Sequence, residues 1–248
     1  MGHKNIYLIL GASSDIGYAL LEKLNEKEEE SVFLCHYHCN SEKIETVLPH
    51  NNNIIEKFQA DFSKLEEVRN FADKIKQKYG SPTHIVHLPA GKLQYTRFKK
   101  FEWEQFQRDL EIQIHAFIVI LQMFLPLMAE KEKKSKIVIM LTSYTIANPP
   151  KHMVSYIMSK YALLGLMKAL AADYAGKQIC INGISPSMIE TKFLDGIDRR
   201  LIEQNALRSI GQRNAIPSDI VPAILFLLSE DSDYINGVNL NISNGNVM

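Results

Sequence analysis

Three side chains near the middle of the chain have the types and the spacing of a proton-transfer site. Tyr156 and Lys160 are four positions apart, so on a helix their side chains lie one turn apart on the same face. A free phenol has a pKa near ~10 and is a poor acid or base at neutral pH, but a neighbouring ammonium favours the phenolate. We therefore expect Lys160 to lower the pKa of Tyr156, so that the phenol can exchange a proton with an alcohol or a carbonyl group.

Ser143 is the third member of this group. It lies 13 positions before Tyr156 and follows the apolar stretch 137–141, which predicts a buried strand. A hydroxyl at the end of that strand can face the helix that carries Tyr156 and Lys160. A Tyr-x-x-x-Lys pair alone also fits an amphipathic helix with a core tyrosine and a solvated lysine, so the functional interpretation depends on the elements that precede it.

A glycine-bearing turn near the N-terminus supports the functional interpretation. The apolar run 6–10 predicts a parallel strand, positions 11–17 form the turn, and positions 18–24 have helical spacing. This order places the N–H groups of a helix start against a pyrophosphate. The residues that we expect to contact a dinucleotide here are Gly11, Ser13, Ser14, Asp15, Ile16 and Gly17, with Asp15 where a third glycine is often found.

The second predicted strand, residues 31–38, should end at the adenosine ribose, so Tyr37 and His38 are candidate cofactor contacts. No Asp or Glu stands between positions 32 and 41. The carboxylate that would bind a 2′-hydroxyl and repel a 2′-phosphate is therefore missing, which favours NADP over NAD. No Arg or Lys appears in this stretch before Lys43 either, so the side chains left to bind a phosphate are His38, Asn40 and Ser41.

The segment 35–39 also contains residue types that bind metals. Along a strand, Cys35 and Cys39 point to one face while His36 and His38 point to the other. The four side chains cannot then enclose one ion, and we predict no metal site.

Two later segments extend the expected cofactor site. The third apolar run, near positions 54–55, leads to Asp61 and Phe62, and Asp61 could either accept a hydrogen bond from an adenine amino group or cap the helix that follows. The fourth predicted strand, 84–88, ends at Ala90 and Gly91. A glycine at that place admits a close-lying ring or ribose. We interpret the two histidines of this strand, His84 and His87, as paired and partly buried rather than catalytic.

The remaining chain alternates between helical and strand patterns without a linker or a repeat. Helices are predicted over 64–79, 101–127, 153–175 and 218–228, strands over 137–141, 179–184 and 238–242, and a mobile lid within 192–217. Strands that alternate with helices predict an α/β fold, in which one doubly wound domain spans residues 1–248 and helices cover both faces of a parallel seven-stranded sheet.

The composition excludes several classes of partner. The 28 basic and 28 acidic residues give no net charge, which argues against nucleic-acid or acidic-lipid binding. No segment reaches the roughly 18–20 uninterrupted apolar residues of a membrane span. Three unframed cysteines and an N-terminus that leads directly into a strand favour the cytoplasm. The apolar helices within 101–127 and 153–175 would permit a homo-oligomer, as a dimer or tetramer.

In this order the motifs resemble the short-chain dehydrogenase/reductase family over nearly the whole chain. They are the turn from Gly11 to Gly17, Ala60-Asp61-Phe62, Ala90-Gly91, Ser143, Tyr156-x-x-x-Lys160, Asn182-x-x-Ser-Pro186 and Ile189-x-Thr191. The segment from Cys35 to Lys43 is also similar to the equivalent piece of 3-oxoacyl-(acyl carrier protein) reductases, most of which use NADPH. The resemblance implies a Rossmann fold and a hydride transfer between a nicotinamide and a carbonyl or secondary alcohol.

The resemblance also implies a role for each motif. Tyr156 would be the acid in reduction or the base in oxidation, with Lys160 on the nicotinamide ribose and Ser143 on the substrate oxygen. The other implied cofactor contacts are Asp61 and Phe62 at the adenine, Ala90 and Gly91 beside the ribose, and Pro186, Ile189 and Thr191 near the carboxamide.

Three residues depart from the family pattern. Gln113 stands where the family has an asparagine that helps to hold a proton-relay water, Pro89 replaces an asparagine that braces the sheet, and Ser187 replaces a common glycine. Ser143, Tyr156 and Lys160 are intact. The sequence therefore predicts an NAD(P)-dependent oxidoreductase acting on a small carbonyl or alcohol substrate. The alternative, suggested by Gln113 and Pro89, is a catalytically impaired nucleotide-binding protein that acts as a sensor or scaffold.

Overall fold

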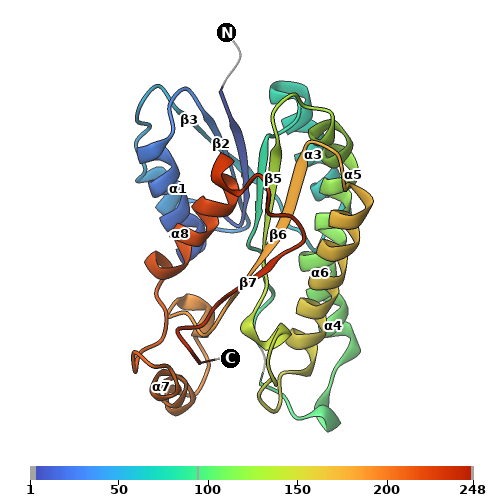
Figure 1. Ribbon diagram of the computed structural model, residues 1–248. Helices are drawn as coiled ribbons and strands as arrows, with labels where there is room; N and C mark the ends of the chain where they lie inside the picture. The colour runs from blue at the N-terminus through green and yellow to red at the C-terminus, as the bar shows by residue number, and fades with distance from the viewer. Residues whose placement is uncertain (1–3, 94, 247–248) are drawn as a thin grey trace.

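A computed structural model describes residues 4–93 and 95–246 (Figure 1). Its centre is a seven-stranded sheet of order β3-β2-β1-β4-β5-β6-β7, and every neighbouring pair is parallel. The strands are β1 (Ile6–Leu10), β2 (Val32–Tyr37), β3 (Ile54–Gln59), β4 (His84–His87), β5 (Ser135–Met140), β6 (Ile179–Pro186) and β7 (Asn239–Ile242). The predicted α/β class with a parallel seven-stranded sheet is confirmed.

Helices cover both faces of this sheet, as Figure 1 shows. They are α1 (Asp15–Lys27), α2 (Glu42–Glu45), α3 (Leu65–Tyr79), α4 (Trp103–Leu110), α5 (Ala116–Ala129), α6 (Val154–Asp173), α7 (Arg199–Arg208) and α8 (Pro217–Leu228). Buried residues of α3, α5 and α6 form a core on one face, and those of α1 and α8 form a core on the other. Strands covered on both sides have almost continuously apolar sequences, which is why β1 and β5 could be recognised in the sequence.

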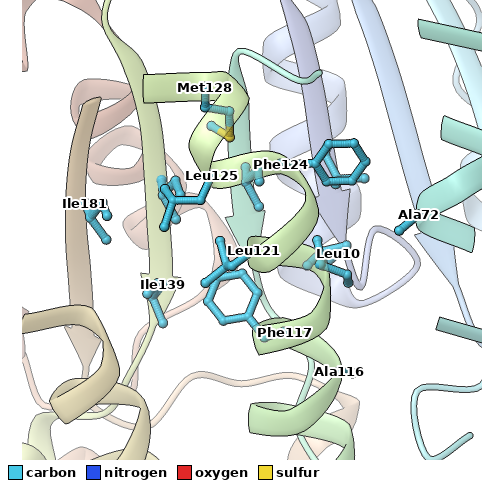
Figure 2. Packing of buried hydrophobic residues seen from close by; sticks show 14 of the residues in the cluster. Leu10, Ala72, Ala116, Phe117, Leu121, Phe124, Leu125, Met128, Ile139 and Ile181 are labelled. Atoms are coloured by element: carbon cyan, nitrogen blue, oxygen red, sulfur yellow. The ribbon is translucent and has the colours of Figure 1, made fainter. Parts of the chain in front are cut away.

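Helix α5 supplies much of the first core. Figure 2 shows Phe117, Leu121 and Phe124 of this helix facing the sheet, near Leu10 of β1 and Ile139 of β5. These five side chains are at most 3% exposed, and full burial of an apolar side chain of this size contributes about 1.5–3 kcal/mol. The packing fixes α5 and the sheet relative to each other, and with them the segment before α5 that reaches the site.

The predicted helix 101–127 is not one regular helix. It comprises α4, a π-helical segment (Glu111–His115) and α5. The continuous stretch Trp103–Ala129 is long and apolar enough to cross a membrane by composition. Half of that window is buried, however, and α5 packs in the core described above. This stretch is a core helix, and its apolar side chains are explained by their packing in the core.

The two histidines of β4 differ from the sequence expectation. Both are almost completely buried, because β4 lies at the centre of the sheet, and burial lowers the pKa of each to about 3. His84 has partners: its ring stacks on Tyr7 and its nitrogens bond Thr83 and the Leu228 carbonyl oxygen. For His87 the expectation of a partner is wrong, since neither ring nitrogen has one among the described residues.

Strand β2 ends at Tyr37, two residues before the end of the segment considered as a metal site. Cys35 is buried inside the strand, whereas His38 and Cys39 lie beyond it, with the Cys39 sulfur 3.2 Å from His38 Nδ1. The strict alternation assumed for all four side chains is therefore wrong for the last two. Within 4–93 and 95–246, no three His, Cys, Asp or Glu side chains are grouped so that they could hold a metal ion.

Candidate active site

A cavity of about 850 Å³ lies at the carboxyl ends of the strands. The strand order reverses between β1 and β4, and in doubly wound sheets ligands bind in the crevice at that place. The cavity wall includes many of the residues predicted from the sequence: Gly11, Ser13, Ser14, Asp15, Ile16, His38, Asp61, Phe62, Ala90, Tyr156, Lys160, Pro186, Ile189 and Thr191. It does not include the other five predicted residues, Gly17, Tyr37, Gly91, Gln113 and Ser143.

The glycine-bearing turn at the start of α1 has a geometry that requires both of its glycines. Gly11 adopts φ +81°, and a Cβ on Gly17 would lie 2.4 Å from the Gly11 carbonyl oxygen. Ser14 connects the two, because its hydroxyl donates to the Gly11 oxygen at 2.8 Å and accepts from Gly17 N at 3.1 Å. Gly17 therefore lies behind the cavity wall and allows α1 to approach β1, as the motif predicts.

His36 holds this turn in place and was not predicted as a site residue. Its Nδ1 accepts from Gly11 N at 3.1 Å, its Nε2 lies 3.0 Å from the Ala60 oxygen, and its ring stacks on Phe62 at 3.8 Å. Burial lowers its pKa to about 4, so the ring is neutral near pH 7, with a lone pair on Nδ1 and a hydrogen on Nε2. His36 thus ties the ends of β1, β2 and β3 together at the cavity wall.

The adenine end of the cavity is organised by charge pairs. Asp15 bonds the Lys43 ammonium, and its second oxygen accepts from Lys192 N at 2.8 Å. Burial opposes ionisation of Asp15, but these two hydrogen bonds outweigh it and lower the pKa of the carboxyl. Asp15 therefore connects the start of α1 to Lys43 of α2 and to the segment before α7, a role that a glycine at this position would lack.

Asp61 follows β3 and lies on the cavity wall. Its Oδ1 accepts hydrogen bonds from Ser63 N at 2.9 Å and from the Ser63 hydroxyl at 2.7 Å. The N-cap residue of α3 is Lys64, so the alternative interpretation of Asp61 as the cap of this helix is wrong. His38 Nε2 lies 3.8 Å from the same oxygen. Asp61 fixes the turn that presents Phe62 to the cavity.

Tyr156 and Lys160 occupy one face of α6, as their spacing predicts. Lys160 is 2% exposed, its Nζ donates to the Met140 carbonyl oxygen at 3.0 Å, and it lies 5.9 Å from the centre of the Tyr156 ring. Burial lowers the pKa of Lys160 to about 8. Burial also raises the pKa of Tyr156 to about 12, although a hydrogen bond with Thr142 opposes that shift.

The expectation that Lys160 lowers the pKa of Tyr156 is therefore wrong for this structure. The ammonium is bonded to a backbone carbonyl instead of the phenol, and burial dominates the titration of Tyr156. The phenol is consequently protonated at neutral pH. A protonated phenol on the wall of a cavity can donate a proton to a carbonyl oxygen.

Ser143 lies at the end of β5, in a short 3₁₀ turn (Ser143–Thr145). It is 1% exposed, whereas its neighbour Thr142 lies on the cavity wall, close enough to Tyr156 to lower the pKa of the phenol. The turn is held by Thr145, whose N–H and hydroxyl both donate to the Thr142 oxygen, at 2.9 and 2.8 Å. The hydroxyl residue placed near the phenol is therefore Thr142, whereas spacing alone identified Ser143.

Gln113 lies in the π-helical segment and is 2% exposed. Its Oε1 has no hydrogen-bond partner in the part of the chain that the structure describes. His87 lies near it. Burial is the largest cause of the lowered pKa of His87, and the Lys160 charge lowers it further. The Gln113 backbone raises this pKa, although no hydrogen bond of normal geometry joins the two residues. His87 of β4 and Gln113 of the π-helical segment therefore lie behind the cavity wall, near Lys160.

Gly91 is close to α4. A Cβ on Gly91 would lie 1.9 Å from the Asp109 Oδ1 atom, so a carboxylate occupies the space that we had expected for a ring or a ribose. Tyr37 is partly buried and packs against the core formed with α1 and α8. Pro89 and Ala90, by contrast, line the cavity.

Comparisons with known proteins identify the family. The family profile described as "Enoyl-(Acyl carrier protein) reductase" matches residues 11–246. The chain belongs to the short-chain dehydrogenase/reductase family. It is 22% identical to a 3-oxoacyl-[acyl-carrier-protein] reductase of Thermotoga maritima over 98% of both chains. It is 29% identical to a 7alpha-hydroxysteroid dehydrogenase of Escherichia coli, over 76% of this chain and 73% of the relative.

Solved structures show the same fold for this short-chain dehydrogenase/reductase. A 3-ketoacyl-(acyl-carrier-protein) reductase from Brucella melitensis complexed with NADH superposes with a TM-score of 0.84, 20% identity and 99% coverage of both chains. A short-chain dehydrogenase/reductase from Serratia marcescens gives 0.86, 19% identity and 99% coverage of both. Membership of the family makes the protein an NAD(P)-dependent oxidoreductase that acts on CH–OH or C=O groups.

The residues present fit a dinucleotide. Gly11, which has no Cβ, lies on the cavity wall just before the start of α1, the place where a pyrophosphate binds a helix N-terminus. Asp61 and Phe62 lie at the end expected for the adenine, and Lys160, Ile189 and Thr191 line the end expected for the nicotinamide.

Proposed function

We propose that this enzyme reduces a ketone to a secondary alcohol with NADPH as the preferred cofactor, and that it can catalyse the reverse oxidation. The observation that carries the proposal is the protonated Tyr156 phenol on the wall of the cavity, one helical turn from the buried Lys160 ammonium. The bound cofactor supplies the hydride. The chain itself holds the substrate oxygen and transfers a proton to it.

In the proposed mechanism, Tyr156 donates its proton to the carbonyl oxygen as negative charge develops there. Ser143 donates a hydrogen bond to the same oxygen, which is the role that the family resemblance implies, and Thr142 orients the phenol from its place on the cavity wall. Lys160 binds the nicotinamide ribose hydroxyls. Pro186, Ile189 and Thr191 hold the carboxamide, and Ala90 lies beside the ribose.

Gln113 and His87 would complete a path for the proton. We propose that a water molecule joins Lys160 to the Gln113 side chain and to the lone pair of His87. Buried polar atoms without a protein partner are commonly satisfied by ordered water, and both residues have such atoms. The longer amide of Gln113 can then replace the usual asparagine.

The preference for NADPH is supported by the residues at the adenine end. Lys43 and His38 both line this end, and β2 ends at Tyr37, without a carboxylate that would bind a 2′-hydroxyl. Although Lys43 is paired with Asp15, its ammonium can bind a 2′-phosphate as well, because it has three donors. The sequence indicated only residues before Lys43 as ligands of the 2′-phosphate. In the structure, helix α2 brings Lys43 to the cavity wall.

Several broader expectations remain part of this proposal. Small acyl-thioester ketones are candidate substrates, because the Thermotoga maritima and Rickettsia prowazekii relatives are named 3-oxoacyl-[acyl-carrier-protein] reductases. Residues 192–217 would act as a lid, since this segment covers one end of the cavity. We further propose that residues 1–248 form one domain of a cytoplasmic homodimer or homotetramer that packs through α5 and α6.

The second candidate is a nucleotide-binding sensor or scaffold with impaired catalysis. The unpartnered Gln113 side chain and Pro89 on the cavity wall favour it, whereas the intact Tyr156 and Lys160 favour the enzyme. Nucleotide fluorescence with a panel of ketones separates the two. The enzyme should bind NADPH more tightly than NADH and oxidise it when a ketone is added. Binding without turnover of any ketone would support the sensor.

A further inference from the structure

Among the described residues, the substrate end of the cavity presents the Arg208 guanidinium and no carboxylate. Beyond Tyr156, its wall is formed mainly by apolar and aromatic side chains of the segment after β4, the segment before α6, and the proposed lid. The residues that matter here are Leu93, Tyr95, Tyr144, Met153, Phe193 and Arg208. The carboxylates on the cavity wall, Asp15, Glu42 and Asp61, come from the ends of the first three strands and lie at the adenine end. The Arg208 guanidinium therefore comes from the lid part of the wall, whereas these carboxylates follow the strand ends.

Arg208 has no acidic partner among the described residues. Two other arginines of the lid do: Arg199 pairs with Glu203 at 3.1 Å, and Arg213 pairs with Asp219 at 2.6 Å. The Arg208 side chain, in the last turn of α7, instead lines the cavity. A guanidinium that is not neutralised by its own protein is free to bind an anion through a pair of parallel hydrogen bonds.

Two tyrosines connect this guanidinium to the reacting group. Tyr144 is close enough to Arg208 for the charge to lower the pKa of its phenol, although burial and Tyr95 raise that pKa overall. Tyr144 is also close enough to Tyr156 to influence its titration. Tyr156, Tyr144 and Arg208 all line the cavity, so the proton donor, an aromatic ring and the cation share one wall.

We propose that Arg208 binds a carboxylate or phosphate group of the substrate. The substrate would be a ketone, or the corresponding alcohol, whose reacting carbon is separated from this anion by an apolar or aromatic part. Tyr95 and Tyr144 contribute ring surface to that part and phenol hydroxyls near the anion. This inference rests on the proposed carbonyl reduction and adds the substrate class, since nothing in the reaction itself requires a charged substrate.

Matched pairs of probes test the inference. The carboxylate arm compares 4-acetylbenzoate with methyl 4-acetylbenzoate, and levulinate with methyl levulinate, because in both acids an aromatic or apolar part separates the ketone from the carboxylate. The phosphate arm compares acetoacetyl-coenzyme A with the neutral thioester acetoacetyl-N-acetylcysteamine. In the wild type, we expect kcat/KM to favour the anionic member of at least one pair by about tenfold or more, because a hydrogen bond to a charged group contributes about 1.5–3 kcal/mol. The arm that shows the preference identifies the anion.

Variants assign this preference to Arg208. In R208Q the ratio of kcat/KM for the anionic to the neutral member should fall about tenfold, mainly through KM. R208K should keep part of the ratio, because it retains the charge but loses the planar pair of donors. The matched control R199Q removes an arginine of the same helix that already has a carboxylate partner, and it should leave the ratio unchanged.

A binding measurement separates this inference from the proposed reaction. With NADP⁺ present, the preferred anionic probe should raise the Tm of the wild type and of R199Q, but not that of R208Q. Equal kcat/KM for both members of every pair, or an unchanged ratio in R208Q, would overturn the assignment of Arg208. If no ketone is reduced but the anion still raises the Tm through Arg208, the proposed reaction fails while the anion site stands.

Discussion

Burial has opposite effects on the two ionisable groups that define the catalytic face of α6. It disfavours the charged form of each, so it lowers the pKa of Lys160 and raises that of Tyr156. At neutral pH the phenol is protonated while the amine remains mostly charged. The free enzyme therefore has the proton needed for carbonyl reduction on the atom that must donate it.

The pH dependence of reduction should follow Lys160. Its pKa is about 8 in the folded chain, so the ammonium is present below that pH and is lost as the pH rises through it. We expect kcat/KM for a neutral ketone to be level from about pH 6.5 to 7.5 and to decline above an apparent pKa near 8. A profile that stays level to about pH 10 would contradict the assigned role of Lys160.

Thr142 should act as a positioning residue for the phenol. Thr142→Val removes the hydroxyl that lowers the pKa of Tyr156, and with it the hydrogen bond that we expect in the reacting enzyme, while keeping the shape of the side chain. A neutral hydrogen bond contributes about 0.5–1.5 kcal/mol, so kcat should fall about three- to tenfold with little change in KM. Thr142→Ser should restore most of the loss. Equal rates for the valine and threonine enzymes would show that the bond does not matter.

Residue types and spacing were sufficient to find Tyr156, Lys160 and the cofactor turn, because each depends on a local pattern. They were insufficient for His36, which appeared to be part of an apolar strand, and for Arg208, which lies in a segment of weak periodicity. Both acquire their roles from contacts between distant segments: His36 bonds Gly11, 25 positions away. The direction of the Tyr156 shift was also missed, since burial cannot be judged from spacing.

At the scale of elements, the turn between β1 and α1 determines whether the cofactor can bind. Gly17→Ala would place a Cβ 2.4 Å from the Gly11 oxygen and 2.8 Å from the Ala12 Cα, which are backbone atoms that cannot rotate away. We expect a loss of about 1–3 kcal/mol in the free energy of unfolding and a marked loss of NADPH affinity. Denaturant unfolding and nucleotide fluorescence measure the two effects.

Gly165 provides the matched control for that substitution. It lies on α6 with no atom within 4 Å of an added Cβ and has no positive φ. Gly165→Ala should leave NADPH affinity unchanged and stabilise the helix by up to about 1 kcal/mol, because alanine is the better helix former. If both substitutions had the same effect, the close approach at Gly17 would not be the cause.

The division of the helix 101–127 shows a limit of periodicity. A helical pattern of apolar residues continues through α4 and α5, so the sequence indicates one element. The π-helical segment between them changes the direction of only a few side chains, Gln113 among them. Such an insertion shifts the register by a single residue, which a broad apolar stripe conceals. Irregular helical turns of this kind are frequent at functional sites.

For the whole molecule, three buried histidines should make stability depend on pH. The pKa of His36 falls to about 4 and those of His84 and His87 to about 3, all through burial. The unfolded chain has histidine pKa values near ~6.5. Between that pH and the pKa values of the folded chain, the unfolded chain binds more protons than the folded chain. The contribution of these histidines to the free energy of unfolding therefore has its full value above about pH 6.5 and decreases as the pH falls toward 4.

Urea unfolding at several pH values measures this dependence. We expect a decline of several kcal/mol between about pH 6.5 and 4, since each pKa unit corresponds to about 1.4 kcal/mol. His84→Gln should reduce the slope of the decline, whereas replacement of the exposed His115 should not. Constant stability across this range would contradict the neutral, buried state of these rings.

The global architecture was the most predictable feature of the chain. Alternating apolar strands and helices led to the parallel seven-stranded sheet, because a fully covered parallel sheet leaves a strong sequence signal. The substrate end was the least predictable, because its wall joins Leu93, Tyr144 and Arg208 from segments that have no common pattern. Cofactor chemistry is thus encoded locally in this family member, whereas substrate choice is encoded in its tertiary structure.

The most direct test of the account is the Tyr156→Phe variant, measured for both NADPH binding and ketone turnover. Phenylalanine keeps the ring in the cavity wall and removes only the proton that Tyr156 donates. We predict that turnover is lost by a factor of about 10³ or more, while the affinity for NADPH stays within about threefold of the wild type. A variant that binds NADPH and reduces the ketone at the wild-type rate would contradict the central claim.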